Sequence, residues 1–116
     1  MGLKIRLDEN DRRWLLALSG DLDYGECATL RVSIDRILKH APASVIVDLS
    51  GIEYLDSSGL GLLLSLSKEY GTHGGRLVLV TNESVDSILD LTRLSGIFSC
   101  ATSVEEAEEM LGTAGL

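Results

Sequence analysis

Cysteine, proline and long apolar runs are scarce in this 116-residue sequence, and each scarcity excludes a class of protein. The two cysteines, Cys27 and Cys100, are too few and too far apart for a disulfide framework, and they form no C-x-x-C pair. With two cysteines and two histidines scattered along the chain, no metal site is expected. The longest apolar run, LGLLLSLS, is far too short to cross a bilayer. Because there is one proline and no low-complexity linker, residues 1–116 are expected to form a single domain.

Positive charge is also in short supply. Ten basic residues face eighteen acidic ones, which gives a formal net charge of −8. Such a surface repels phosphate backbones, so we expect no direct nucleic-acid binding and favourable partners that are basic. The N-terminal MGLKIRLDEND carries charges where a signal peptide needs an apolar stretch. A cytoplasmic protein without membrane association is therefore expected.

Hydrophobic periodicity predicts strands that alternate with helices after an N-terminal hairpin. The predicted elements are a hairpin at 3–19, a helix from 27 that ends before 42, a strand at 44–50, a helix at 58–70, a strand at 76–80, a helix at 84–94, a strand at 97–100 and a helix at 103–111. This order predicts an α/β fold with a mixed, mostly parallel sheet, an antiparallel hairpin at its edge and about four helices.

The segment YLDSSGLGLLL places polar residues between a predicted strand and a leucine-rich helix. Functional groups gather at such carboxyl ends of strands in α/β sheets. Ser57 or Ser58 is expected to cap the helix, which leaves the other hydroxyl without a structural role. Gly59 and Gly61 would let the first helical turn approach its neighbours closely. Asp23 lies in the GDLD turn after a neighbouring strand and is expected at the same edge of the sheet. With Glu26 it resembles a capping box for the helix that follows it, which starts at 27.

The sequence resembles a known family along essentially its full length. DSSGLG after VIVDLSGIEYL resembles the signature of the STAS domain, named for sulphate transporters and anti-sigma-factor antagonists. LSGDLD before the first helix, GG before RLVLV, and LTRLSGIF before the last strand extend the resemblance. Within the family, the motif is most similar to the free-standing bacterial anti-sigma-factor antagonists, also called anti-anti-sigma factors.

This resemblance implies a regulatory protein rather than an enzyme. In the family, the unmodified antagonist binds an anti-sigma-factor serine kinase and so frees a sigma factor; phosphorylation by that kinase ends the binding, and a phosphatase resets it. The resemblance implies that Ser57 is the phosphoacceptor, that Ser58 holds the helix start, and that no cofactor is needed. The remaining partner-binding residues would be Asp23, Asp56, Gly59 and Leu60. A monomer or weak dimer is expected.

Other interpretations remain open at this stage. Leu60 and Leu62 belong either to the core or to an exposed apolar patch beside Ser57. An intrinsic hydrolase would need an imidazole base, for which the sequence offers His40 and His73 but no G-x-S-x-G elbow. A nucleotide could bind at the DSSGLG helix start, although no Walker lysine follows the glycines. The chain could also serve as the STAS subunit of a transporter complex or of a stress-signalling assembly.

Overall fold

The structure, a computed structural model, describes residues 2–72 and 74–112. Within these residues the strands and helices alternate as predicted. The elements are β1 (Leu3–Asn10), β2 (Arg13–Leu22), a short 3₁₀ turn (Tyr24–Glu26), α1 (Cys27–His40), β3 (Ser44–Leu55), α2 (Ser57–Thr72), β4 (Arg76–Val80), α3 (Glu83–Leu91), β5 (Cys100–Ala101) and α4 (Val104–Leu111).

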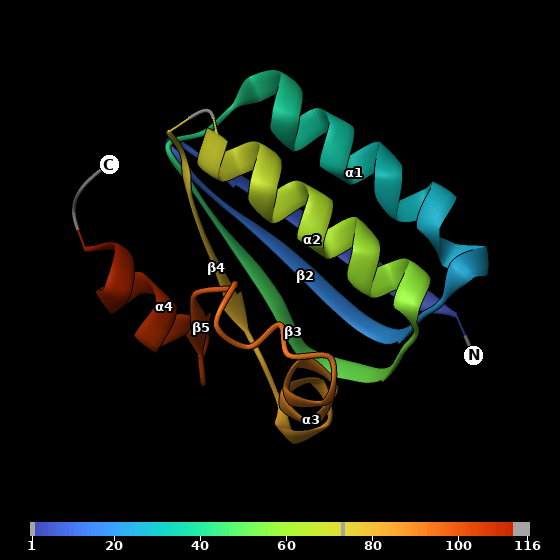
Figure 1. The fold of residues 1–116 in the computed structure, drawn as a ribbon. Helices are drawn as coiled ribbons and strands as arrows, with labels where there is room; N and C mark the ends of the chain where they lie inside the picture. The colour runs from blue at the N-terminus through green and yellow to red at the C-terminus, as the bar shows by residue number, and fades with distance from the viewer. Residues whose placement is uncertain (1, 73, 113–116) are drawn as a thin grey trace.

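The five strands form one mixed sheet in the order β1-β2-β3-β4-β5, so that each strand lies beside its neighbour in the chain. Figure 1 shows β2, β3 and β4 side by side. β1 runs antiparallel to β2, and every other neighbouring pair is parallel. The predicted α/β fold with an antiparallel hairpin at the edge is therefore confirmed. No helix among the described residues is long and apolar enough to span a membrane.

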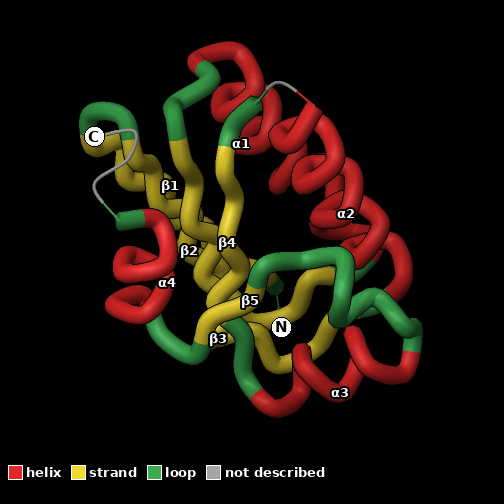
Figure 2. Tube along the Cα trace, turned by 60° about the vertical axis from the view of Figure 1, so that its left-hand side comes forward, coloured by secondary structure: helices red, strands yellow, loops and turns green. Residues whose placement is uncertain are grey.

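Helices cover both faces of the sheet and create two apolar clusters (Figure 2). α1 and α2 pack on one face, where Val45, Val47 and Leu49 of β3 join the larger cluster. α4 packs on the opposite face, where Ile46 of β3 joins the smaller one. Side chains alternate between the two faces of a strand, and β3 is apolar on both, as its near-continuous Val-Ile-Val run predicts.

Several element boundaries differ from the prediction. β2 and β3 are longer than expected because they continue to pair as far as Leu22 and Leu55, past two irregularities in their register. α3 ends early, at Leu91, because Arg93 adopts a left-handed conformation (φ 60°) and Leu94 N–H donates to the Leu89 carbonyl. Leu91, the last residue of α3, is 84% exposed.

Candidate functional site

The carboxyl ends of β2 and β3 bring the two predicted polar turns together. Leu22 and Leu55 are partners in the parallel register, and the Asp56 N–H donates to the Leu22 carbonyl at 3.2 Å. The turn containing Asp23 therefore lies beside the turn containing Ser57, as predicted. We call this surface the Ser57 rim and define it by the residues Asp23, Tyr24, Tyr54, Asp56 and Ser57.

Asp56, and neither serine, caps α2. Its carboxylate Oδ1 accepts a hydrogen bond from the Gly59 N–H at 3.0 Å, and its carbonyl accepts from the Leu60 N–H at 3.0 Å. The prediction that Ser57 or Ser58 caps the helix is wrong, because the helix already begins at Ser57 and the N-cap is the residue before it. Ser58 therefore does not hold the helix start.

The second Asp56 oxygen ties the two turns to each other. Oδ2 accepts from the Tyr24 N–H at 3.0 Å, so one carboxylate satisfies backbone donors in both segments. Asp23 in turn caps the 3₁₀ turn, because its Oδ1 accepts from the Glu26 N–H at 3.2 Å. The expected pairing of Asp23 with Glu26 is confirmed, although it precedes a 3₁₀ turn that leads into α1. These bonds hold the backbone around Ser57 in a fixed position.

Ser57 is exposed at the first position of α2, whereas Ser58 is half-buried. Because the Asp56 carboxylate caps the helix at the Gly59 N–H, the Ser57 hydroxyl is not required for capping. Its position at a helix N-terminus also favours an added anion, by about 0.3–1 kcal/mol. The residue predicted as phosphoacceptor is thus accessible to a partner.

Gly59 and Gly61 were both expected to permit close approach of the helix to its neighbours. In the structure only one of them does. Gly59 is buried, and a Cβ there would lie 2.6 Å from Leu22 Cγ and 2.7 Å from the Leu22 carbonyl oxygen. A Cβ at Gly61 would meet nothing within 4 Å. The expectation is confirmed for Gly59 and wrong for Gly61. Gly59 allows the first turn of α2 to pack directly on the end of β2.

We expect Gly59→Ala to lower the free energy of unfolding by about 1–3 kcal/mol, since the methyl group would overlap the Leu22 carbonyl oxygen and the buried Leu22 side chain. Gly61→Ala is the matched control in the same helix. It should leave stability unchanged or raise it by up to about 1 kcal/mol, because alanine favours the helix. Urea unfolding of the two variants measures both effects. Equal destabilisation by both substitutions would contradict the close-contact assignment.

The apolar part of the exposed surface is not where the sequence placed it. Leu60 and Leu62 are each only 6% exposed and belong to the core, so the alternative of an apolar patch at these leucines is wrong. Leu60 is therefore unavailable as a contact residue on the surface. Tyr24 and Tyr54 are exposed instead, by 79% and 54%. Sequence reasoning missed both tyrosines because neither belongs to a periodic apolar pattern.

An open groove of about 270 Å³ adjoins the Ser57 rim between the start of α1 and α2. Its lining residues are Tyr24, Cys27, Arg31, Ser58, Gly61, Leu62 and Ser65. Burial raises the pKa of the Cys27 thiol, and the carboxylates of Asp56 and Asp23 raise it further. The thiol thus remains protonated at neutral pH and is a poor nucleophile. It serves as a small apolar side chain in the wall of the groove.

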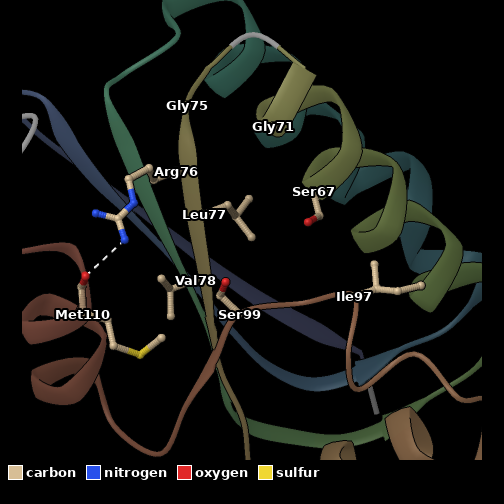
Figure 3. Close-up of a pocket in the computed structure, with 9 residues that line it drawn as sticks. All are labelled: Ser67, Gly71, Gly75, Arg76, Leu77, Val78, Ile97, Ser99 and Met110. Atoms are coloured by element: carbon tan, nitrogen blue, oxygen red, sulfur yellow. Dashed lines mark hydrogen bonds between the residues drawn. The ribbon is translucent and has the colours of Figure 1, made fainter.

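A second cavity, of about 330 Å³, lies at the other end of α2 and takes in none of the predicted site residues (Figure 3). It opens between α2, β4 and α4, where Arg76 donates from Nη2 to the Met110 carbonyl at 3.1 Å. His40, a candidate base, also lies away from Ser57: it ends α1 and packs on Trp14, with ring centroids 5.3 Å apart. His73 lies outside the described residues.

The family model for the STAS domain matches residues 4–107. The chain belongs to the STAS domain family. Its curated relatives include the anti-sigma F factor antagonist of Paenibacillus polymyxa, which is 28% identical over 100 residues, or 84% of this STAS chain and 83% of the relative. A solved structure of a putative anti-sigma factor antagonist from Thermotoga maritima is 25% identical, with a TM-score of 0.83 over 91% of this chain and 92% of that one.

Two solved structures of the anti-sigma factor antagonist SpoIIAA share the STAS fold. Its unphosphorylated form has a TM-score of 0.77 and 24% identity, over 96% of this chain and 99% of that one. Its phosphorylated form, from Bacillus, has a TM-score of 0.72 and 21% identity, over 94% of this chain and all of that one. At these identities the likeness establishes the fold of this STAS domain.

Proposed function

We propose that this STAS domain is an anti-sigma-factor antagonist switched by phosphorylation at Ser57. In its unphosphorylated form it binds an anti-sigma-factor serine kinase through the Ser57 rim, and the kinase then releases a sigma factor. Phosphorylation ends the binding, and a phosphatase restores it. These partners use ATP and act on transcription, so the proposed location is the cytoplasm. The chain itself acts by binding and catalyses no reaction.

One observation carries this proposal: an exposed serine that its own fold does not need, at the first position of a helix, in a chain whose curated relatives are named anti-sigma factor antagonists. The carboxylate of Asp56 occupies the cap, so the Ser57 hydroxyl is left for a partner. The fold accepts an anion at this point because the helix N-terminus carries partial positive charge.

The proposed reaction is a phosphoryl transfer between two proteins. The Ser57 Oγ attacks the γ-phosphorus of ATP held by the kinase, the bond to the β–γ bridging oxygen breaks, and ADP leaves. The hydroxyl proton passes to a base of the kinase, and the chain carries a phosphoserine. The phosphatase reverses the modification with water, which returns the serine hydroxyl and inorganic phosphate. Each Asp56 oxygen already accepts from a backbone N–H, and the proposal therefore assigns the base to the kinase.

The surface around Ser57 combines exposed aromatic side chains with acidic ones, which suits a protein partner that presents an apolar contact and basic side chains. Tyr24 and Tyr54 offer large exposed rings, and tyrosine is enriched among residues that dominate binding energy. The carboxylates of the strand ends, among them Asp23, Glu53 and Asp56, make the surroundings acidic. We therefore expect the docking face of the kinase to contribute basic side chains around a central apolar contact.

Incubation with purified candidate serine kinases and ATP tests the proposal. Mass spectrometry should find one phosphate on the parent chain, at Ser57, and none on Ser57→Ala. Ser58→Ala is the matched control and should still be labelled. Labelling at another residue, or equal labelling of Ser57→Ala, would overturn the assignment. Co-purification with a transporter ATPase in place of a kinase would favour the transporter role.

Tyr24→Ala is expected to weaken binding to the same kinase about tenfold, because truncation of an exposed tyrosine at a binding surface removes about 1–2 kcal/mol. Ile97→Ala is the control: Ile97 is 54% exposed but lines the cavity at the other end of α2. Calorimetric titration should show unchanged affinity for that control. If both variants bind as tightly as the parent, Tyr24 lies outside the docking surface.

A further inference from the structure

β1 forms one edge of the sheet, and its outer side is open. It pairs with β2 along eight residues without a register shift, and in the described part of the chain no other strand pairs with it. The strand contains no proline, and its length exceeds that of a typical protected edge. A long, regular edge strand presents a row of backbone donors and acceptors that another strand can use.

The hydrogen-bond pattern shows which residues point outward. The Asp21 N–H donates to the Gly2 carbonyl at 3.0 Å, in the same register that pairs Leu3 with Gly20. In an antiparallel ladder, alternate residues bond to the same neighbour, so the even-numbered residues of β1 bond to β2. The residues whose N–H and C=O groups point to the open edge are Leu3, Ile5, Leu7 and Glu9.

We propose that this edge pairs antiparallel with the same edge of a second copy of the chain, centred on Leu7. Two-fold pairing centred on Ile5 would place Lys4 opposite Arg6 of the other copy. Pairing centred on Arg6 would place the two Arg6 side chains opposite each other, and pairing centred on Asp8 would do the same with the two Asp8 side chains. Like charges directly opposite are unfavourable. Centring on Leu7 instead sets Arg6 against Asp8 of the other copy, and the two-fold symmetry makes this contact twice. The backbone N–H and C=O groups of Leu7, which point to the open edge, would then bond to those of Leu7 in the other copy.

The side chains that would meet are available. Arg6 and Asp8 lie on the face of β1 opposite the main core, with side chains 67% and 48% exposed. Within the single chain they form an ion pair, with Arg6 Nε 3.3 Å from Asp8 Oδ2. On the other face, Arg36 of α1 binds Glu9 of β1. Val32 precedes Arg36 by one helical turn, on the same side of α1, and is 70% exposed. An exposed branched side chain therefore flanks the open edge and would be partly covered by the pairing.

This pairing is compatible with kinase docking and independent of it. The Ser57 rim lies at the carboxyl ends of β2 and β3, so a dimer joined along β1 would keep both copies of the rim free. The contact is smaller than a standard protein interface because it joins one strand to another. The dimer is thus expected to be weak and to dissociate on dilution.

Charge complementation between two variants tests the register. Sedimentation equilibrium of the natural sequence in low salt, over concentrations up to about 1 mM, should show a monomer–dimer equilibrium. Arg6→Asp sets two carboxylates opposite each other in its own dimer, and Asp8→Arg sets two guanidinium groups opposite each other. Each variant alone should dimerise about tenfold more weakly than the parent. An equimolar mixture should recover dimers, because each contact then joins opposite charges.

The mixture also separates the proposal from a simple effect on folding. Both variants place like charges within their own β1, so recovery on mixing cannot come from the contact inside one chain. Thermal unfolding should confirm that each variant is folded. A natural sequence that stays monomeric throughout the series would overturn the proposal. Dimers that are unaffected by the single substitutions, or that fail to return in the mixture, would overturn the register.

Discussion

Phosphorylation of Ser57 is expected to weaken binding to the anti-sigma-factor kinase on the order of a thousandfold, while the fold stays unchanged. The effect within the domain is small because two contributions oppose each other. A phosphate adds about −1.5 to −2 charges at the N-terminus of α2, which is favourable by about 0.3–1 kcal/mol. The nearby Asp56 carboxylate repels the same charge and offsets part of that gain.

We expect a larger effect between the molecules, because a docked serine kinase would hold a nucleotide. A serine kinase must bring nucleotide phosphates up to the acceptor hydroxyl, so a phosphoserine would meet negative charge in a site shaped for a hydroxyl. Like charges brought together at an interface cost several kcal/mol. This cost exceeds the gain at the helix by severalfold, so we expect the proposed switch to act through the interface.

Binding of four forms of the chain to the kinase and nucleotide measures the switch. The phosphorylated chain should bind on the order of a thousandfold more weakly than the unmodified chain. Ser57→Ala should bind like the parent because it adds no charge, and Ser57→Asp should fall between them. On phosphorylation, the amide NMR chemical shifts of the free chain should change near the start of α2 and stay constant across β4 and β5. Equal affinities, or shifts that spread across the sheet, would contradict a switch confined to the interface.

The architecture was predictable because its periodic elements agree with one another. The alternation of LKIRL and the β-branched SVIVDLS run identified β1 and most of β3. The C-terminal ends of β2 and β3 were missed because they are strands by virtue of pairing with each other, and their local sequence shows no strand pattern. β5 contains only Cys100 and Ala101, which is too short for any period to be read.

The position of the site was predictable, but its internal hydrogen bonds were not. Parallel neighbours required the turns at Asp23 and Ser57 to meet, and they do. The capping residue was assigned one or two positions late because Asp and Ser have similar preferences at an N-cap. Only the structure distinguishes them, since Asp56 alone reaches both the Gly59 and Tyr24 N–H groups. Exposure of the tyrosines depends likewise on packing across the sheet.

Asp56→Ala is expected to lower the free energy of unfolding by about 2–3 kcal/mol. The change removes the cap of α2, typically about 1 kcal/mol, and a charge-assisted bond to the Tyr24 N–H, worth about 1.5 kcal/mol or more. Asp56→Asn keeps one oxygen for Gly59 but turns its amide toward the second donor, and should lose about half as much. Ser58→Ala should stay within about 0.5 kcal/mol of the parent. Urea unfolding measures the free energy of unfolding of the three variants, and the loss should be largest for Asp56→Ala and smallest for Ser58→Ala.

The same substitution should also reduce phosphorylation of Ser57, although Asp56 touches no reacting atom. The bond to Tyr24 holds the turn after β2 against the start of α2, so its loss frees both segments that a kinase would contact. Ser58→Ala should be labelled at the parent rate, because its hydroxyl supports neither segment. If Ser58→Ala destabilises the chain as much as Asp56→Ala, the cap belongs to the serine. A destabilised Asp56→Ala labelled at the parent rate would show that the kinase accepts Ser57 without a fixed backbone around it.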